Sequence, residues 1–141
     1  MSSRANAFTC YHPGPMTLAA IYIRTDPEGE LPSADEQRSI TESYAAEQGH
    51  EIVARYEDLE APGKLLYHKP SLKDAIANIK EQEEWETLIV AEPRCVSDDE
   101  SAVNELVHKF SLYGNALESP ARSWEESLAI MRSYRRAQSG R

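Results

Sequence analysis

Charged residues follow three apolar runs of the sequence, and their combined chemistry depends on whether they meet in space. Arg24 and Asp26 end the first run, Asp58 ends the second, and Glu92 and Arg94 follow the third. In open α/β sheets, ligands bind at the carboxyl ends of the strands, where such residues would gather. Guanidinium groups could hold a phosphate there, because arginine recognises phosphate oxygens through paired N–H donors.

The same region allows two other interpretations. A group of carboxylates could supply the hard oxygen ligands that Mg²⁺ prefers, although separate, solvated carboxylates are the simpler alternative. The carboxylates concerned are Asp26, Asp58, Glu60 and Glu92. Arg24 and Asp26 could instead form an ion pair that caps the sheet, with Arg94 joining the same network. Such a pair would need no ligand, and removing one partner would destabilise the fold.

The elements that would position these residues alternate between strands and helices. Four segments are apolar or alternating runs of strand length, and four others carry helical periodicity or helix start signals. The predicted strands span 17–26, 51–58, 87–91 and 115–117, and the predicted helices begin near residues 33, 70, 97 and 119. This order predicts an α/β fold in three layers, with a mostly parallel four-stranded sheet and helices on both faces.

Local signals sharpen the predicted boundaries. Ser33 and Glu36 fit a capping box, and Gly49 is placed to end the same helix near Gln48. Ser97 with Glu100 fits a second capping box. The helix after it should turn one apolar face to the core, formed by Val103, Leu106, Val107 and Phe110. The first strand is a near-continuous apolar run, which predicts burial on both faces.

Composition limits the class of protein. The chain has 141 residues, which is the size of one domain with its own core. Two cysteines make neither a disulfide framework nor a metal quartet, which favours a reducing cytoplasm. No segment approaches the roughly 18 apolar residues of a membrane span. Residues 1–120 carry 10 Lys and Arg against 22 Asp and Glu, an acidity that disfavours nonspecific binding to DNA.

The two ends of the chain differ from the central part. Residues 1–15 show no strand or helix pattern and are expected to be disordered, so Met16 is a possible start. Residues 121–141 predict an amphipathic helix with a basic tail. The apolar side of this helix is Trp124, Leu128 and Met131, and the basic side chains include Arg132, Arg135 and Arg136. The helix could pack on the sheet or form a subunit interface, and the arginines could contact DNA or an acidic partner.

Three blocks in the predicted core resemble a known family. They are Ala-Ile-Tyr-Ile-Arg24-Thr-Asp26 with Ser33-Ala-Asp-Glu-Gln37, then Tyr56-Glu-Asp58 with Pro62-Gly63-Lys64 and Lys69-Pro70-Ser-Leu72, and Leu88-Ile-Val-Ala-Glu-Pro-Arg94. Their order and spacing resemble the N-terminal catalytic domain of the resolvase/invertase family of serine recombinases. In that family the first block is Tyr-x-Arg-Val-Ser. The resemblance covers residues 17 to about 119 and implies the strand order 2-1-3-4.

Departures from the family pattern fall on the catalytic positions. The family's serine attacks a DNA phosphodiester, and arginines of all three blocks stabilise the charge on the phosphoryl oxygens. Asp26 stands at the serine position, Lys69 replaces one arginine, and Pro93 replaces the aspartate beside Arg94. The last arginine of the third block is replaced by Ser97, or by Asp98 on a one-residue shift. The positions that match the active pattern are Arg24, Gln37 and Arg94.

These departures predict a recombinase-type fold without strand-cleaving activity. A carboxylate at the serine position would repel the phosphate by roughly 4 kcal/mol at ~4 Å and an effective dielectric of 20. The expected role is contact with proteins, as a homodimer or with a recombinase-type partner, with DNA binding weak, no cofactor and no membrane. Residues that could contact DNA or a partner are Arg24, Lys64, Lys69, Arg94, Arg132, Arg135 and Arg136. The alternatives are an active recombinase or nuclease fragment with a rearranged site, and a Mg²⁺-dependent small enzyme using the acidic edge.

Overall fold

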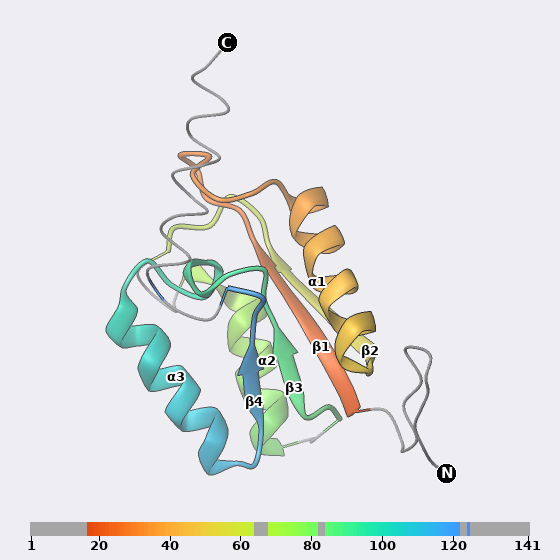
Figure 1. Ribbon diagram of the computed structural model, residues 1–141. Coiled ribbons are helices and arrows are strands. Elements are labelled where there is room, and N and C mark those ends of the chain that lie inside the picture. Colours follow the sequence, from red (N-terminus) through yellow and green to blue (C-terminus); the bar gives the residue numbers. More distant parts are fainter. Residues whose placement is uncertain (1–16, 64–67, 82–83, 122–123, 125–141) are drawn as a thin grey trace.

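The computed structural model describes residues 17–63, 68–81, 84–121 and 124. Strands and helices alternate along the chain, as the sequence predicts (Figure 1). They are β1 (Thr17–Arg24), α1 (Ala34–Gln48), β2 (His50–Asp58), α2 (Pro70–Glu81), β3 (Thr87–Ile89), the short 3₁₀ helix η2 (Pro93–Cys95), α3 (Glu100–Leu112) and β4 (Ala116–Glu118). The expected disorder of residues 1–15 and the expected helix over 121–141 lie outside the described residues, apart from Ala121 and Trp124.

The four strands form one parallel sheet in the order β2-β1-β3-β4, which confirms the predicted topology. β1 is central and pairs with β2 along its whole length, with a register shift between Ala19 and Ala20. From Ala19 to Arg24 every residue of β1 is buried, as its apolar run predicts. β2 alternates between exposed and partly buried residues, because it lies at the edge of the sheet.

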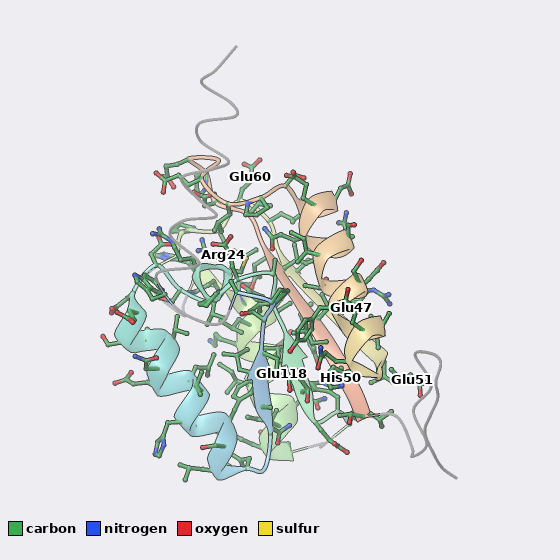
Figure 2. The ribbon with its side chains drawn as sticks, in the orientation of Figure 1. Arg24, Glu47, His50, Glu51, Glu60 and Glu118 are labelled. Carbon is green, nitrogen blue, oxygen red and sulfur yellow. The ribbon has the colours of Figure 1, made fainter. Side chains whose placement is uncertain are left out.

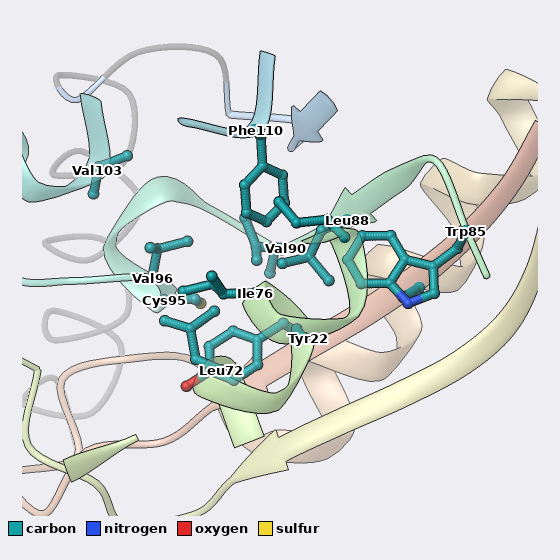
Figure 3. Packing of buried hydrophobic residues seen from close by; sticks show 14 of the residues in the cluster. Tyr22, Leu72, Ile76, Trp85, Leu88, Val90, Cys95, Val96, Val103 and Phe110 are labelled. Atoms are coloured by element: carbon teal, nitrogen blue, oxygen red, sulfur yellow. The ribbon is translucent and has the colours of Figure 1, made fainter. Parts of the chain in front are cut away.

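Two apolar clusters fill the space on the two faces of the sheet. One lies between the sheet and α2 and α3, and its largest members include Trp85 and Phe110, whose ring centroids are 6.3 Å apart (Figure 3). The other lies under α1, where Ala45 packs against Ile21, Ile23 and Ile89. The molecule therefore has the expected three layers, with α1 on one face and α2 and α3 on the other.

The first helix begins and ends as its sequence predicts. Ser33 Oγ accepts the backbone N–H of Glu36, and the Glu36 carboxylate accepts the N–H of Ser33, so the capping box is complete. Gly49 adopts the left-handed conformation, with φ of 76°, and ends the helix after Gln48. Such a φ is costly for a residue with a Cβ, which explains the glycine here.

The start of α3 differs from the prediction. The helix begins at Glu100, and its N-cap is Asp99, whose carboxylate accepts the N–H of Ser101. Ser97 lies two residues earlier and accepts the N–H of Asp99 through its hydroxyl, so the predicted capping box is wrong. Val107 is also not in the core, because 43% of it is exposed. Val103 and Phe110 are buried and Leu106 is partly buried, so the core-facing side of the helix is narrower than predicted.

The carboxyl ends of the strands lie at one edge of the sheet, which is where the sequence places the charged residues. β1 ends at Arg24, labelled at this edge in Figure 2, and β2 ends at Asp58 beside it in the pairing register. β3 ends at Ile89, two residues earlier than predicted, and the chain then turns through η2. Because η2 follows at this end of β3, Arg94 and Cys95 are brought next to Arg24.

Candidate functional site

The side chain of Arg24 is fully buried at the edge of the sheet, and protein atoms accept its hydrogen bonds. Nε donates to the carbonyl of Cys95 at 3.0 Å, and Nη1 donates to the carbonyl of Ala61 at 2.8 Å. Nη2 donates to the carbonyl of Arg94 at 2.6 Å and to Asp98 Oδ1 at 3.0 Å. The guanidinium thus ties the end of β1 to the two loops that follow β2 and β3.

Asp98 is the anion at the centre of this network. Its Oδ1 lies 3.0 Å from Arg24 Nη2 and 3.4 Å from Arg94 Nη2, and Arg94 also approaches Glu30 at 4.0 Å. Asp98 packs directly against Gly63, where any Cβ would overlap the carboxyl group. The predicted ion pair between Arg24 and Asp26 is wrong, and Asp98 takes the place of Asp26. Arg94 joins the network as the sequence indicates.

Asp26 belongs to a turn, where its carboxylate binds backbone groups. Its oxygens accept the N–H of Glu30 at 2.9 and 3.1 Å and the N–H of Leu31 at 3.0 Å. Its neighbour Thr25 accepts the N–H of Glu60 through Oγ1 at 2.8 Å. Asp26, which stands at the position that resembles the family's nucleophilic serine, therefore stabilises a turn. Its neighbour Thr25 stabilises the loop that follows β2.

Gln37 joins α1 to the end of β1. Its Oε1 accepts the backbone N–H of Arg24 at 3.1 Å, and its Nε2 donates to the carbonyls of Arg24 at 2.7 Å and Pro32 at 2.8 Å. The same Oε1 accepts the thiol of Cys95 at 3.3 Å. Burial, and then the charge of Glu92, raises the pKa of Cys95 to about 12, so this thiol is chemically quiet.

Asp58 holds the start of α2 against the central strand. It accepts the hydroxyl of Tyr22 at 2.8 Å and the backbone N–H groups of Ser71 and Leu72 at 3.0 and 3.1 Å. A carboxylate at a helix N-terminus satisfies otherwise unpaired N–H groups. Burial, and then the charge of Asp58, raises the pKa of Tyr22 far above its usual range, so the phenol remains a hydrogen-bond donor.

Lys69 is 2% exposed and donates through Nζ to the carbonyls of Gly63 and Val96, both at 2.8 Å. Burial, and then the nearby charge of Arg24, lowers the pKa of its ammonium to about 8. A lysine at this position therefore ties the loop after β2 to the loop after β3. The charges of Asp98 and Asp58 act in the opposite direction, but less than burial and Arg24 do.

The depressed pKa of Lys69 predicts a pH-dependent stability. Its ordinary pKa of 10.5 should return on unfolding, so between pH 8 and 10.5 the unfolded chain binds more protons than the folded one. The free energy of unfolding of the wild type, minus that of Lys69→Met, should therefore rise as the pH rises from about 8 towards 10. Urea denaturation at a series of pH values measures this difference.

Lys73, on the exposed side of α2, offers a matched control for this measurement. The same difference is taken between the wild type and Lys73→Met. If the free energy of unfolding of the wild type minus that of Lys69→Met falls or stays constant over this pH range, the lowered pKa of Lys69 is contradicted.

The carboxylates considered for Mg²⁺ do not form a cluster. Among the described residues, no group of three or more His, Cys, Asp or Glu side chains is placed to hold a metal ion. Asp26 and Asp58 accept backbone N–H groups of different segments, as described above, and Glu92 is buried. The geometry therefore gives no support to a metal site built from these three residues.

Trp124 is the one predicted interface residue that the structure describes. It packs against the apolar cluster below α2 and α3, and Arg94 Cζ lies 5.6 Å from the centroid of its ring. A guanidinium over an indole face is a favourable cation–π contact. The other predicted contact residues, Lys64, Leu128, Met131, Arg132, Arg135 and Arg136, lie outside the described residues.

Sequence reasoning missed Asp98 as the anion that pairs with Arg24, and Gly63 as the residue against which Asp98 packs. Asp98 was named only as a substitute for a family arginine, and Gly63 only as part of a loop. A signal for the first existed in the charge reversal itself, because an acidic residue at an arginine position favours pairing with the arginines that remain. The carbonyls of Ala61, Arg94 and Cys95 carry no sequence signal at all.

Comparisons with known proteins agree with this geometry. The profile of the family described as "Resolvase, N terminal domain" matches residues 19–136. Among solved structures, the N-terminal catalytic domain of TP901-1 integrase is 22% identical with a TM-score of 0.65, and the match covers 87% of this chain and 97% of that one. A search of curated protein sequences found no match.

Two further solved structures share the fold. The C-terminal catalytic domain of ISC1926 TnpA, an IS607-like serine recombinase, has a TM-score of 0.64 at 17% identity, covering 87% of this chain and 83% of that one. A resolvase family site-specific recombinase from Streptococcus pneumoniae has a TM-score of 0.61 at 16% identity, covering 88% of this chain and 89% of that one. In the described part of the chain, no helix is long and apolar enough to cross a membrane.

Proposed function

Because the chain belongs to the resolvase family through its N-terminal, serine-recombinase-type domain, we propose that it is a non-catalytic member that acts through contacts with other proteins. Its role would lie in DNA recombination, as a homodimer or beside a recombinase-type partner, in the cytoplasm. The single observation that carries this proposal is the closed ion-pair network in which Asp98 binds both Arg24 and Arg94.

Phosphoryl transfer needs cationic groups that are free to meet the developing negative charge. Arg24 has no exposed surface, and its hydrogen bonds go to three carbonyls and one carboxylate. To bind a phosphate it would have to leave these acceptors unpaired inside the protein. Each unsatisfied buried group costs about 1–3 kcal/mol, so the exchange is unfavourable.

The reacting groups are equally poorly suited to cleavage. Asp26 would bring a carboxylate towards the phosphate and would form an acyl phosphate on attack, a poor intermediate for rejoining DNA. The hydroxyls on loops and helix starts near this edge include those of Thr25, Ser71 and Ser97. Each makes its hydrogen bond to a backbone group, so none is cradled by several cations. This supports a protein without a substitute nucleophile.

We expect the purified chain to form no covalent link to DNA. The test incubates it with nicked suicide duplexes, which trap a cleaved intermediate, and searches for a protein–DNA adduct after denaturation. An active serine recombinase on its own site is the positive control. A protein–DNA adduct formed by the wild-type chain would overturn the proposal.

Asp26→Ser separates the two reasons for inactivity. This variant restores a hydroxyl but leaves Arg24 bound to Asp98, so we expect no adduct from it either. An adduct from the variant alone would mean that the arginines remain usable and that only the nucleophile has been lost. In that case the argument from the closed ion-pair network would be wrong.

A further inference from the structure

A cavity of about 470 Å³ lies beside β4, away from the buried Arg24 network. Its walls come from α1, from the start of α3, from β4 and from the residues that follow β4. The lining residues used below are Tyr44, Glu100, Asn104, Leu117, Glu118 and Trp124. This volume is in the range of protein sites that bind small molecules or a few side chains.

The charge of the cavity is negative. Among the described residues, its lining includes the carboxylates of Glu100 and Glu118 and holds no lysine, arginine or histidine. Arg94 lies behind the indole of Trp124, and Asp98 already pairs with it. A cation that enters the cavity would therefore meet two carboxylates. Among the described residues, neither carboxylate forms a salt bridge to lysine or arginine that the cation would have to displace.

The carboxylate of Glu118 is held in place by the side chains of Tyr44 and His50. The hydroxyl of Tyr44 donates to its Oε1 at 3.0 Å, and His50 Nε2 lies 3.0 Å from the same oxygen (Figure 2). The described residues give no hydrogen bond to its other oxygen, Oε2. About one third of the Glu118 side chain is exposed, so this carboxylate can accept a donor from outside.

Glu100 is the first residue of α3 and is exposed. The unpaired N–H groups at a helix start favour a negative charge nearby, so a carboxylate suits this position. Asn104 follows one turn later on the same helix and also lines the cavity. The α3 wall thus offers a charged and a neutral acceptor.

The open edge of β4 adds main-chain groups to the cavity. In the described part of the chain β4 pairs only with β3. Ala116 donates to the carbonyl of Glu86, and the carbonyl of Glu118 accepts from Val90, so both residues turn their backbone groups towards β3. Since alternate residues of a strand bond to opposite neighbours, Leu117 turns its N–H and C=O outwards.

We propose that this cavity and the edge of β4 bind an extended segment of another protein that presents an arginine side chain. The main chain of the segment pairs with Leu117, and the guanidinium reaches Glu100 and Glu118 between the rings of Tyr44 and Trp124. Strand addition with a pocket for a side chain is a recurring mode of peptide recognition. The inference concerns a different surface from the Arg24 network and does not depend on the loss of catalysis.

Arginine fits this site better than lysine for geometric reasons. A guanidinium is planar, stacks on aromatic rings and donates to carboxylates through two N–H groups at once. Lysine is a point charge that holds its water more strongly. The combination of two carboxylates and two aromatic residues in one lining therefore selects the planar cation.

The test measures binding of two labelled peptides to the full chain by fluorescence anisotropy. One has the sequence Ser-Thr-Val-Arg-Val-Thr-Ser, and the other carries citrulline, a neutral group of the same shape, in place of arginine. We expect the arginine peptide to bind at least about tenfold more tightly, because only the charged guanidinium forms charge-assisted hydrogen bonds with the two carboxylates. Amide resonances should shift at Leu117 when it binds.

Three variants locate the effect. Glu100→Gln and Glu118→Gln should each weaken the arginine peptide by about three- to tenfold and leave the citrulline peptide unchanged. Glu105→Gln is the matched control, because Glu105 is an exposed carboxylate of the same helix outside this cavity. Glu100→Gln keeps the test decisive even if Glu118→Gln disturbs the contacts of Tyr44 and His50.

Several results would overturn the proposal. Equal binding of the two peptides would exclude recognition of arginine, and an equal loss in Glu105→Gln would mean nonspecific attraction. Tighter peptide binding after Arg132, Arg135 and Arg136 are all changed to Gln would identify the chain's own segment as the occupant. A doubled mass in sedimentation that Glu100→Gln abolishes would identify a second copy of the chain.

Discussion

Replacing Arg24 by alanine is expected to lower the free energy of unfolding by about 3–5 kcal/mol, enough to unfold much of the protein at moderate temperature. The side chain has no exposed surface and makes four hydrogen bonds. Its removal leaves three carbonyls and the carboxylate of Asp98 without a donor and opens a cavity at the edge of the sheet. Urea denaturation followed by far-UV circular dichroism measures the loss.

Two further variants test whether the loss of stability is specific to the buried guanidinium. Arg24→Lys should be intermediate, because an ammonium has three donors on a point charge and cannot match the planar fork that reaches four acceptors. Arg55→Ala is the control, since Arg55 is half exposed and pairs with Glu42 on the surface, where an ion pair contributes about 1 kcal/mol or less. A stable, folded Arg24→Ala protein would contradict the stabilising role of this network and would remove the argument that its contacts keep the guanidinium from a ligand.

Asp58→Ala is the second change with a large expected effect, a loss of about 3 kcal/mol of unfolding free energy. It leaves three donors without an acceptor, namely the hydroxyl of Tyr22 and the N–H groups of Ser71 and Leu72. Hydrogen bonds to a charged group contribute about 1.5–3 kcal/mol each, and their losses do not add fully because they share one carboxylate. Thermal and urea denaturation both measure the effect.

The size of the Asp58 effect can be compared with two simpler losses. Asp99→Ala removes a helix N-cap at the exposed start of α3 and should cost about 1 kcal/mol. Tyr22→Phe removes only one of the three hydrogen bonds to Asp58, so its cost should also be smaller. If Asp58→Ala costs no more than Asp99→Ala, Asp58 does not anchor α2 to the sheet as the contacts indicate.

Much of the fold followed from local patterns in the sequence. Apolar runs and helical periodicity identify elements because each one must bury a face, and the capping box of Ser33 and Glu36 is complete within four residues. The strand order came from the resemblance of three blocks to a family. The start of α3 was misplaced because Ser97 and Asp99 both suit an N-cap, and only the backbone decides between them.

The ion pairs and hydrogen bonds around Arg24 could not be predicted in the same way. Arg24 and Asp26 are two residues apart, which places side chains on the same face only while a strand continues. β1 ends at Arg24, so Asp26 enters a turn and binds its backbone, while Arg24 reaches Asp98, 74 positions along the chain. Such a long-range pair depends on the path of the loops after β3, which no local pattern records.

The fit between Asp98 and Gly63 bears on how a sequence of this kind can change over generations. A hydroxyl introduced at position 26 would still leave Arg24 bound to Asp98. An arginine introduced at position 98 would bring more bulk against Gly63, where even an added Cβ meets the present carboxylate, and would set one guanidinium beside another. A single substitution at position 26 or 98 therefore does not open a cationic site without disturbing these contacts, so several coordinated changes separate this arrangement from one that could hold a phosphate.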